Sequence, residues 1–299
     1  TLVEAGPLPE GWCGKSNAAY TGAKQARGHW LLFTDADTVH APGSLAQSLA
    51  EAKRHGAALL SFSPAQELSG IVQRAVMPVI FAELACEYRP RQVCDPNSPA
   101  AAANGQYLLI AREAYDAVGG HAAIASSLLE DVELAKAVKR SGRNVRFRFG
   151  GDAVSARMYR SFRQLAEGWT KNLALLFKAP IQLAITRLLE FFAIVCGLAL
   201  VGLAAAPGDV HVAVMVGISV VLIYLGFLIR IMKAHAGAGS ALLAIFGLPI
   251  FSYLLLCSKL YYKWHGSVTW KGRRYSTAPS NRQSAAQPSA RPTGERWST

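Results

Sequence analysis

Three apolar stretches in the last third of the chain constrain its fold more than any other feature. They lie at residues 183–206, 210–231 and 241–262, and each is about as long as the roughly 20 residues that a helix needs to cross a bilayer. The first two predict membrane-spanning helices. Gly247 and Pro249 interrupt the third stretch. This predicts a kinked or re-entrant segment, because broken helices are tolerated at membrane depth where protein covers them.

The composition and the charge fit a protein attached to a membrane. Of the 299 residues, 52% are hydrophobic and 17% are charged, and the formal net charge is +12. We find no zinc-finger spacing and no aromatic RNA-binding motif, so nucleic acid is not expected as a partner. An anionic membrane surface is the expected partner of the basic charge. The five cysteines are scattered without a CxxC pair, which indicates reduced thiols in a cytosolic compartment.

Basic residues between and after the apolar stretches predict how the chain crosses the membrane. Residues 207–209 contain no Lys or Arg, which suits the outer side, whereas Arg230 and Lys233 precede the third stretch and suit the cytosol. Three full crossings would place the basic C-terminal residues outside, against the positive-inside rule. We therefore expect the segment around Pro249 to be re-entrant, so that the basic motif at residues 270–275 (WKGRRY) returns to the cytosolic face.

The residues before these stretches predict an α/β domain. Buried-strand patterns alternate with helical patterns, which is typical of a largely parallel sheet covered by helices. The expected strands lie at residues 30–33, 57–63, 107–111 and 143–149, and the main expected helices at residues 15–27, 42–55 and 128–140. A further apolar helix at residues 71–88 contains Pro78. It is too short and interrupted for a membrane span, and an interfacial position is our interpretation.

A basic amphipathic stretch separates this domain from the apolar region. Between residues 160 and 180, basic residues alternate with apolar ones such as Leu165 and Trp169. This pattern indicates a helix on the membrane surface, with packing in a protein core as the alternative. After residue 276 the chain is rich in Ser, Pro, Gln and Arg, which indicates disorder. The predicted layout is an α/β domain at residues 1–159, an interfacial helix at 160–180, membrane helices at 181–265, and a basic motif with a disordered tail at 266–299.

Two carboxylates follow the first expected strand. Asp35 and Asp37 are spaced i, i+2, so both side chains point to one face of an extended chain. At the end of a strand they can converge on one hard cation, and substrate phosphates commonly complete such a Mg²⁺ or Mn²⁺ site. The alternative is a capping or turn pair, because an isolated Asp-x-Asp is common in proteins.

Further motifs follow one another along the chain. They are GWCGKSNA at residues 11–18, TDAD at 34–37, NGQ at 104–106, ED at 130–131 and QLAEGW at 164–169. Together with the apolar C-terminal part, this order resembles the membrane-bound family-2 glycosyltransferases of the GT-A fold. Within them, the chain is similar to the branch that acts on lipids, which includes the hopanoid-associated, carotenoid and ceramide glycosyltransferases.

The resemblance covers about residues 5–275 and implies the fold class. It implies an α/β, GT-A-like, partly Rossmann-type domain with a mixed sheet, followed by an α-helical transmembrane region. The GT-A fold normally begins with two strand–helix units that bind the nucleotide base, and nothing in the chain corresponds to them. We therefore expect an N-terminally truncated domain. The resemblance also implies a multi-pass protein of the inner cell membrane with a cytoplasmic catalytic domain.

The resemblance further implies a nucleotide-sugar donor, expected to be a UDP-sugar, and a membrane lipid as acceptor. Asp35 and Asp37 match the family's metal and nucleotide-sugar carboxylates, and would hold Mg²⁺ or Mn²⁺ on the donor diphosphate. Lys15 and Asn17 would lie beside the donor nucleotide. The donor-binding residues implied are Lys15, Asn17, Asp35, Asp37, Gly105, Gln106 and Trp169.

Asp131, preceded by Glu130, matches the catalytic base of the family's Glu-Asp motif. Family-2 enzymes invert at the anomeric carbon, so we expect one base that takes the acceptor proton and no enzyme nucleophile. The alternative for Asp131 is structural, since a carboxylate is favoured at a helix N-terminus. Trp169 would be the Trp of the family's Gln-x-x-Arg-Trp motif, with an interfacial anchor as its alternative. Gly168 occupies the Arg position of that motif, so Lys171 is the substitute cation.

Two other functions fit parts of the sequence. Residues 31–39 look like the nucleophile strand of haloacid-dehalogenase-type phosphohydrolases, and Ser61 ends the next apparent strand. Against this hypothesis, no later acidic pair fits the metal role, and the membrane segments are left unexplained. The other alternative is an inactive, truncated membrane protein that keeps the scaffold without binding a donor.

Overall fold

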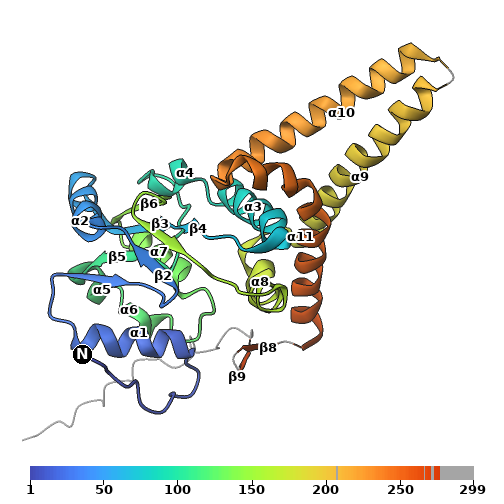
Figure 1. The fold of residues 1–299 in the computed structure, drawn as a ribbon. Helices are drawn as coiled ribbons and strands as arrows, with labels where there is room; N and C mark the ends of the chain where they lie inside the picture. The colour runs from blue at the N-terminus through green and yellow to red at the C-terminus, as the bar shows by residue number, and fades with distance from the viewer. Residues whose placement is uncertain (207, 266, 271–272, 277–299) are drawn as a thin grey trace, which may run out of the picture.

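The chain forms an α/β domain followed by long helices (Figure 1). The computed structural model describes residues 1–206, 208–265, 267–270 and 273–276, with side chains described up to Trp264. The strands are β1 (Trp30–Phe33), β2 (Thr38–His40), β3 (Ala57–Ser63), β4 (Ala65–Gln66), β5 (Leu108–Ala111), β6 (Asn144–Phe149), β7 (Val154–Ala156), β8 (Ser267–Trp270) and β9 (Arg273–Ser276). The helices are α1 (Gly14–Gln25), α2 (Ser44–Arg54), α3 (Gly70–Glu87), α4 (Pro90–Cys94), α5 (Arg112–Ala117), α6 (Gly120–Ala123), α7 (Glu130–Arg140), α8 (Phe162–Leu176), α9 (Pro180–Ala205), α10 (Val210–Ile231), the 3₁₀-helix η1 (Met232–Ala234) and α11 (Ala238–His265).

The central sheet has four strands in the order β1-β5-β3-β6. Strand β5 is antiparallel to both of its neighbours, whereas β3 and β6 are parallel. The sheet is therefore mixed, as the resemblance implied, and the expectation of a largely parallel sheet is wrong. The reason is that β5 inserts between β1 and β3 and runs against both. A smaller sheet has the order β2-β7-β4.

The central sheet is buried on both faces. Alternate side chains of a strand point to opposite faces, so Leu59 and Ile110 lie in one core cluster together with residues of α7. Leu60 and Leu109 lie in another cluster together with residues of α2. The packed sheet provides a rigid base for the loops at its edge, where the candidate site residues lie.

Helices α3, α8 and α11 share a separate hydrophobic core. Leu165, Trp169 and Leu173 of α8 are buried in it. The apolar face of α8 is therefore explained by packing inside the protein, which was the alternative to an interfacial helix. Membrane contact of the exposed residues of α8 stays a prediction. Helix α3 is buried from Ala75 to Ile80, so this part of its apolar sequence belongs to the core. An interfacial position of its exposed residues stays a prediction.

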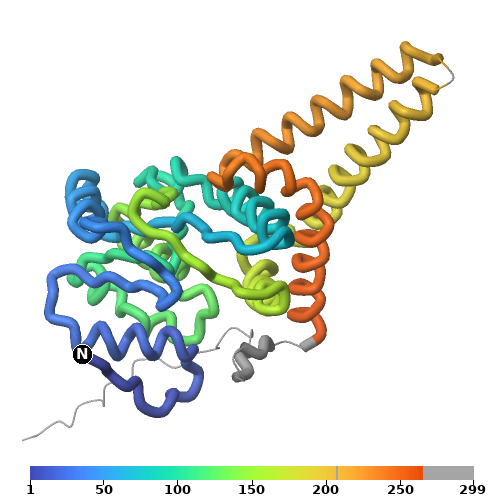
Figure 2. Tube along the Cα trace, viewed as in Figure 1, coloured from blue at the N-terminus to red at the C-terminus, as the bar shows by residue number. Residues whose placement is uncertain are grey.

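In the described part of the chain, three helices are long and apolar enough to cross a membrane, at residues 180–205, 210–234 and 238–264. Helices α9 and α10 project away from the domain as a hairpin (Figures 1 and 2). Helix α11 packs against α3 and α8 instead. It is one continuous helix with Pro249 inside it, and Figure 2 shows that it bends. The bend agrees with the kinked alternative, while a re-entrant course stays a prediction.

Both ends of α11 adjoin the α/β domain or α8. Before its start, the His235 ring stacks on the Phe149 ring, with ring centroids 4.0 Å apart. In its middle, a Cβ atom at Gly247 would overlap the carbonyl oxygen of Ala75, so the backbones of α11 and α3 touch. After its end, β8 contacts α8 and pairs with β9. Residues 271–272 of the basic motif and the predicted tail from residue 277 lie outside the described residues.

Four charged side chains join α3 to the base of the α9–α10 hairpin. Arg187 Nε donates to Glu83 Oε1 at 2.8 Å. Arg230 Nε forms an ion pair with the same Glu83 oxygen at 2.8 Å, but its geometry is not that of a hydrogen bond. Arg230 Nη2 donates to Glu190 Oε2 at 2.6 Å. All four side chains are at most 19% exposed. Because buried charges need partners, this cluster fixes the hairpin against the domain.

Candidate active site

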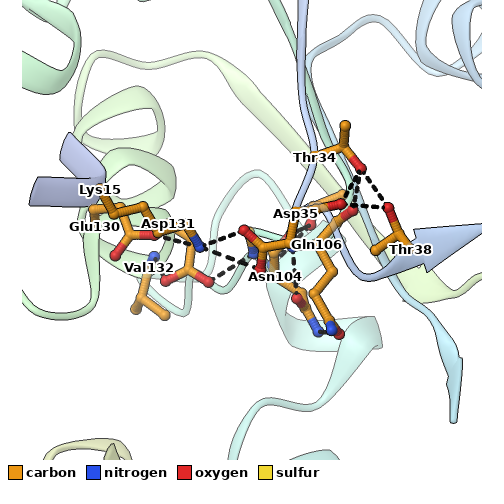
Figure 3. A network of polar contacts seen from close by, with 11 residues as sticks. Lys15, Thr34, Asp35, Thr38, Asn104, Gln106, Glu130, Asp131 and Val132 are labelled. Atoms are coloured by element: carbon orange, nitrogen blue, oxygen red, sulfur yellow. Dashed lines mark hydrogen bonds and ion pairs between the residues drawn. The ribbon is translucent and has the colours of Figure 1, made fainter. Parts of the chain in front are cut away.

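Lys15 lies in the first turn of α1 and points at two carboxylates. The Cys13 N–H donates to the Ala125 carbonyl at 2.7 Å, which ties the start of α1 to the segment that leads to α7. The Lys15 ammonium lies 3.0 Å from Asp35 Oδ1 and 2.9 Å from Glu130 Oε1 (Figure 3). Burial acts to lower the pKa of Lys15, but these carboxylates raise it above its ordinary value. Lys15 is therefore a fixed cation between α7 and the loop after β1.

The loop that carries Asp35 is held by hydroxyl groups. Thr34 donates to the Gln106 carbonyl at 3.0 Å, and its Oγ1 lies 2.7 Å from Thr38 Oγ1 and 3.0 Å from His40 Nε2. Thr38 donates to the Asp35 carbonyl at 2.7 Å. These bonds close the turn between β1 and β2, and the Asp35 carboxylate faces Lys15 (Figure 3).

The loop at residues 104–106 lies next to the ion pair of Lys15 and Asp35. The Asn104 side chain accepts from the Gln106 N–H at 2.9 Å, and the Gly105 N–H donates to Asp131 Oδ2 at 2.7 Å. A Cβ atom at Gly105 would lie 2.6 Å from the Lys15 ammonium. Only a residue without a side chain leaves Lys15 in its place, which explains a glycine here.

Asp131 lies half-buried in the first turn of α7. Its Oδ2 accepts from the Gly105 N–H, and its Oδ1 accepts from the Val132 N–H at 2.8 Å. Each oxygen keeps a second lone pair for another donor. Burial, and next the charge of Glu130, raise the pKa of Asp131 to about 6, although Lys15 and the two backbone N–H groups act to lower it. A carboxylate with such a pKa is suited to general base work near neutral pH.

A cavity of about 260 Å³ joins these groups to an apolar region. Lys15, Asp35, Gly105 and Asp131 line its polar part. Part of its apolar lining comes from α3, β6 and α8 and includes Phe81, Leu84, Ala85, Phe149 and Leu176. Pockets with a mostly apolar wall and a few convergent polar groups are the usual form of a ligand site.

Helix α8 contributes three neighbouring polar or aromatic side chains. Trp169 lines the cavity, is nearly fully buried, and donates from Nε1 to the Met77 sulfur at 3.3 Å. It is therefore a wall of the cavity and not a lipid-facing anchor. Asn172 also lines the cavity, and its Oδ1 is buried without a hydrogen-bond partner among the described residues. Burial lowers the pKa of Lys171, against the charges of Glu130 and Asp131.

The Arg position of the family's tryptophan motif is closed by another side chain. A Cβ atom at Gly168 would lie 2.6 Å from the Tyr159 hydroxyl oxygen. A long basic side chain therefore does not fit at this position. The sequence departs from the motif for a steric reason, and Lys171 on the same helix stays the predicted substitute.

Two of the expected donor-binding residues do not join the others. Asn17 is buried in α1, and its side chain donates to the Ala5 carbonyl at 3.4 Å. Asp37 is exposed at the outer end of the turn, where its carbonyl accepts from the Arg157 N–H at 3.1 Å. Asp37 adds to the effect of burial in raising the pKa of Tyr159. The donor roles of Asn17 and Asp37 stay predictions.

Comparison with known proteins identifies the family. The family model described as Glycosyl transferase family 21 matches residues 2–283. The chain belongs to glycosyl transferase family 21. A curated relative, the 4,4'-diaponeurosporenoate glycosyltransferase of Staphylococcus haemolyticus (strain JCSC1435), is 31% identical over 176 residues. The match covers 54% of this chain and 44% of the relative, so the matched region spans less than half of the relative's length.

The family 21 membership agrees with the expected fold and weakens the phosphohydrolase hypothesis. That hypothesis placed Ser61 at the end of a strand. Ser61 instead lies within β3, is fully buried, and exchanges hydrogen bonds with the backbone of Asn104 at 2.8 and 3.2 Å. Its hydroxyl is therefore occupied in joining β3 to the loop at residues 104–106.

The divalent cation expected from the sequence stays a prediction, and Asp35 and Asp37 are the residues that would hold it. Among the described residues, no group of three or more His, Cys, Asp and Glu side chains forms a ready metal site. Asp35 and Asp37 carry carboxylates on one turn, and hard cations such as Mg²⁺ are commonly bound by one or two carboxylates together with substrate phosphates. Mg²⁺ or Mn²⁺ is thus compatible with this turn only when an anionic ligand supplies further oxygens.

Several residues of this family 21 site were not found from the sequence. Thr38 and His40 brace the Asp35 turn, and Asn172, Phe149 and His235 line the cavity. Their positions depend on contacts between distant segments. One usable signal was present, because Asn172 follows Trp169 by three residues and so lies near it on the same side of a helix.

Proposed function

We propose that this family 21 chain transfers a sugar from a nucleotide-diphosphate donor to a membrane lipid, with inversion at the anomeric carbon. One observation carries the proposal. The half-buried Asp131 carboxylate, whose pKa is about 6, lines a cavity that has Lys15 and Asp35 in its polar part and apolar side chains elsewhere. Such a cavity suits an anionic donor and an apolar acceptor together.

The donor side of the proposal rests on Lys15. Its ammonium is held between Asp35 and Glu130, so it is preorganised to meet a diphosphate without losing its partners. Asp35 and Asp37 would hold Mg²⁺ or Mn²⁺, which neutralises charge on a diphosphate leaving group. A UDP-sugar is the donor that we propose. We propose Lys171, on the adjoining α8, as a second cation that neutralises charge on the diphosphate leaving group.

The acceptor side rests on Asp131. Both of its oxygens are oriented by backbone N–H groups, and a remaining lone pair would accept the proton of the acceptor hydroxyl. As that proton leaves, the hydroxyl oxygen forms a bond to the anomeric carbon, and the bond from that carbon to the diphosphate oxygen breaks with its electron pair. One base is sufficient for this displacement.

We further propose that the protein is a multi-pass protein of the inner cell membrane with its α/β domain on the cytoplasmic side. The apolar helices α9 and α10 support membrane attachment. The curated relative's name gives 4,4'-diaponeurosporenoate as what it glycosylates, and we propose a comparably apolar acceptor here. The acceptor is taken to reach Asp131 from the membrane.

Transfer from a panel of labelled nucleotide sugars to a membrane lipid extract, with and without EDTA, tests this function. Asp131→Asn should lower the transfer rate at least about 100-fold, the scale of general base catalysis, while calorimetry shows unchanged donor binding. Asp116→Asn, an exposed carboxylate on α5, is the matched control and should transfer normally.

Unchanged transfer by Asp131→Asn would remove this residue as the base. Wild-type protein that binds no nucleotide sugar and transfers none would favour the inactive scaffold.

A further inference from the structure

The apolar part of the cavity runs toward the junction between the domain and the membrane helices. Besides α3 and α8 residues, its lining includes Lys233, Ala234 and His235, which lie in and just after η1. Helix η1 directly continues α10 and packs against α3. The cavity that contains Asp131 therefore reaches the point where two of the apolar helices meet.

This end of the cavity is held in place from several sides. Arg230, in the last turn of α10, is paired with Glu83 of α3, and Lys233 Nζ lies 3.5 Å from the sulfur of Cys86. His235 has a φ of 52°, which makes it the one non-glycine residue with positive φ in the described part of the chain. Such a backbone costs free energy and persists where surrounding contacts impose it.

The His235 ring covers the cavity wall at β6. It lies nearly parallel to the Phe149 ring, at an angle of 6°, yet His235 itself is exposed. Lys233 is exposed as well. The turn after η1 therefore has one side on the cavity and the other side open, as the rim of an entrance would have.

We infer that the apolar part of the cavity binds the hydrocarbon chain of the acceptor lipid, which enters past His235 and Phe149. The inference rests on the proposed function, because the acceptor's hydroxyl would then lie at Asp131. Two observations identify the occupant as a hydrocarbon chain. Phe81, Leu84 and Ala85 make the α3 wall apolar, and the entrance adjoins helices that are apolar enough to lie in a membrane.

A photoreactive long-chain alcohol tests chain binding without any need for catalysis. In detergent micelles, a diazirine in the chain should label the peptide of α3 that contains Ala85, and an unlabelled alcohol of the same length should compete. Ala85→Trp places a bulky side chain in the apolar part of the cavity and should abolish this labelling. Labelling of the apolar helix α10 by the same alcohol should persist. Val72→Trp, at an exposed position of the same helix, is the matched control and should behave as wild type.

Transfer assays then separate the two proposals. Ala85→Trp should lower transfer to long-chain acceptors at least tenfold, with donor affinity and transfer to a short-chain soluble acceptor unchanged. The inference is overturned if Ala85→Trp is labelled and active like Val72→Trp, or if it impairs short and long acceptors equally. Wild-type protein that transfers no sugar to any acceptor would overturn the proposed function alone, because the labelling result does not depend on transfer.

Discussion

The Lys15 ammonium lies 2.9 Å from a carboxylate oxygen of Glu130, the residue that precedes the proposed base. Lys15 comes from α1 and Glu130 from α7, so the pair joins two helices that are far apart in the sequence. The same ammonium also pairs with Asp35. One cation thereby links the proposed donor carboxylate to the proposed catalytic helix.

Replacing Lys15 by Met should weaken donor binding and leave the fold intact. A hydrogen bond to a charged group contributes about 1.5–3 kcal/mol, so we expect the donor Kd to rise about 10- to 100-fold. Isothermal calorimetry with nucleotide sugars measures this. Lys24→Met removes an exposed lysine of the same helix and should not change the Kd. Equal donor affinity in Lys15→Met would exclude Lys15 from the donor site.

The pH dependence of kcat/KM should report Asp131. Because the deprotonated carboxylate is the base and its pKa is about 6, kcat/KM should rise with pH around that value. Glu130→Gln removes a negative charge that raises this pKa, so the midpoint should move to lower pH. Lys15→Met removes a charge that lowers it, so the midpoint should move to higher pH. Glu133→Gln, in the same first turn of α7, serves as control and should leave the midpoint in place.

A side chain at Gly105 should displace Lys15. In Gly105→Ala the new methyl group would lie within 2.6 Å of the present Lys15 nitrogen position, so donor affinity should fall as in Lys15→Met. Gly22→Ala is the contrasting variant, since nothing lies within 4 Å of its Cβ position. It should raise stability by up to about 1 kcal/mol, the difference in helix propensity, with normal donor binding. A Gly105→Ala protein with unchanged affinity contradicts the steric argument.

The buried charge cluster should be essential for stability. Glu83→Gln leaves Arg187 and Arg230 with Glu190 as their remaining acidic partner in this cluster, and breaking a buried pair costs about 3–5 kcal/mol. The thermal unfolding midpoint in detergent should fall clearly. Glu167→Gln breaks an exposed pair with Arg163, which is worth at most about 1 kcal/mol, so its midpoint should change little. Equal midpoints for the two variants would show that the cluster does not fix the hairpin.

The C-terminal end of α11 should lie on the same side of the membrane as the α/β domain. In an 18-residue apolar stretch of α11, 39% of the residues are buried inside the protein, against 11% in the corresponding stretches of α9 and α10. Both ends of α11 adjoin α8 or the domain. A reporter fused after residue 276 should therefore be active on the cytoplasmic side. The same reporter inserted at residues 207–209 should be active on the opposite side. A C-terminal reporter active outside would show that α11 crosses fully.

Local patterns predicted most of the elements. The strand at residues 57–63 is found with the expected bounds, and the Asp-x-Asp pair does follow a strand, because a buried apolar run ending in polar residues favours this geometry. Patterns that only count apolar residues were less informative. Residues 71–88 and 160–180 were interpreted as membrane-surface segments, yet their apolar faces pack against each other and against α11. Sequence periodicity shows that a face is apolar but not what covers it.

The sequence by itself determined the α/β class, the three apolar helices, and the residue types of the candidate site, because these depend on periodicity and on motifs within short segments. The tertiary structure alone decided that β5 runs against its neighbours and that Gly105 makes room for Lys15. It also decided that Asp131 is half-buried with a raised pKa, and that α3, α8 and η1 extend its cavity toward the membrane helices. Each of these depends on distances between segments far apart in the chain, and burial and charge act through such distances.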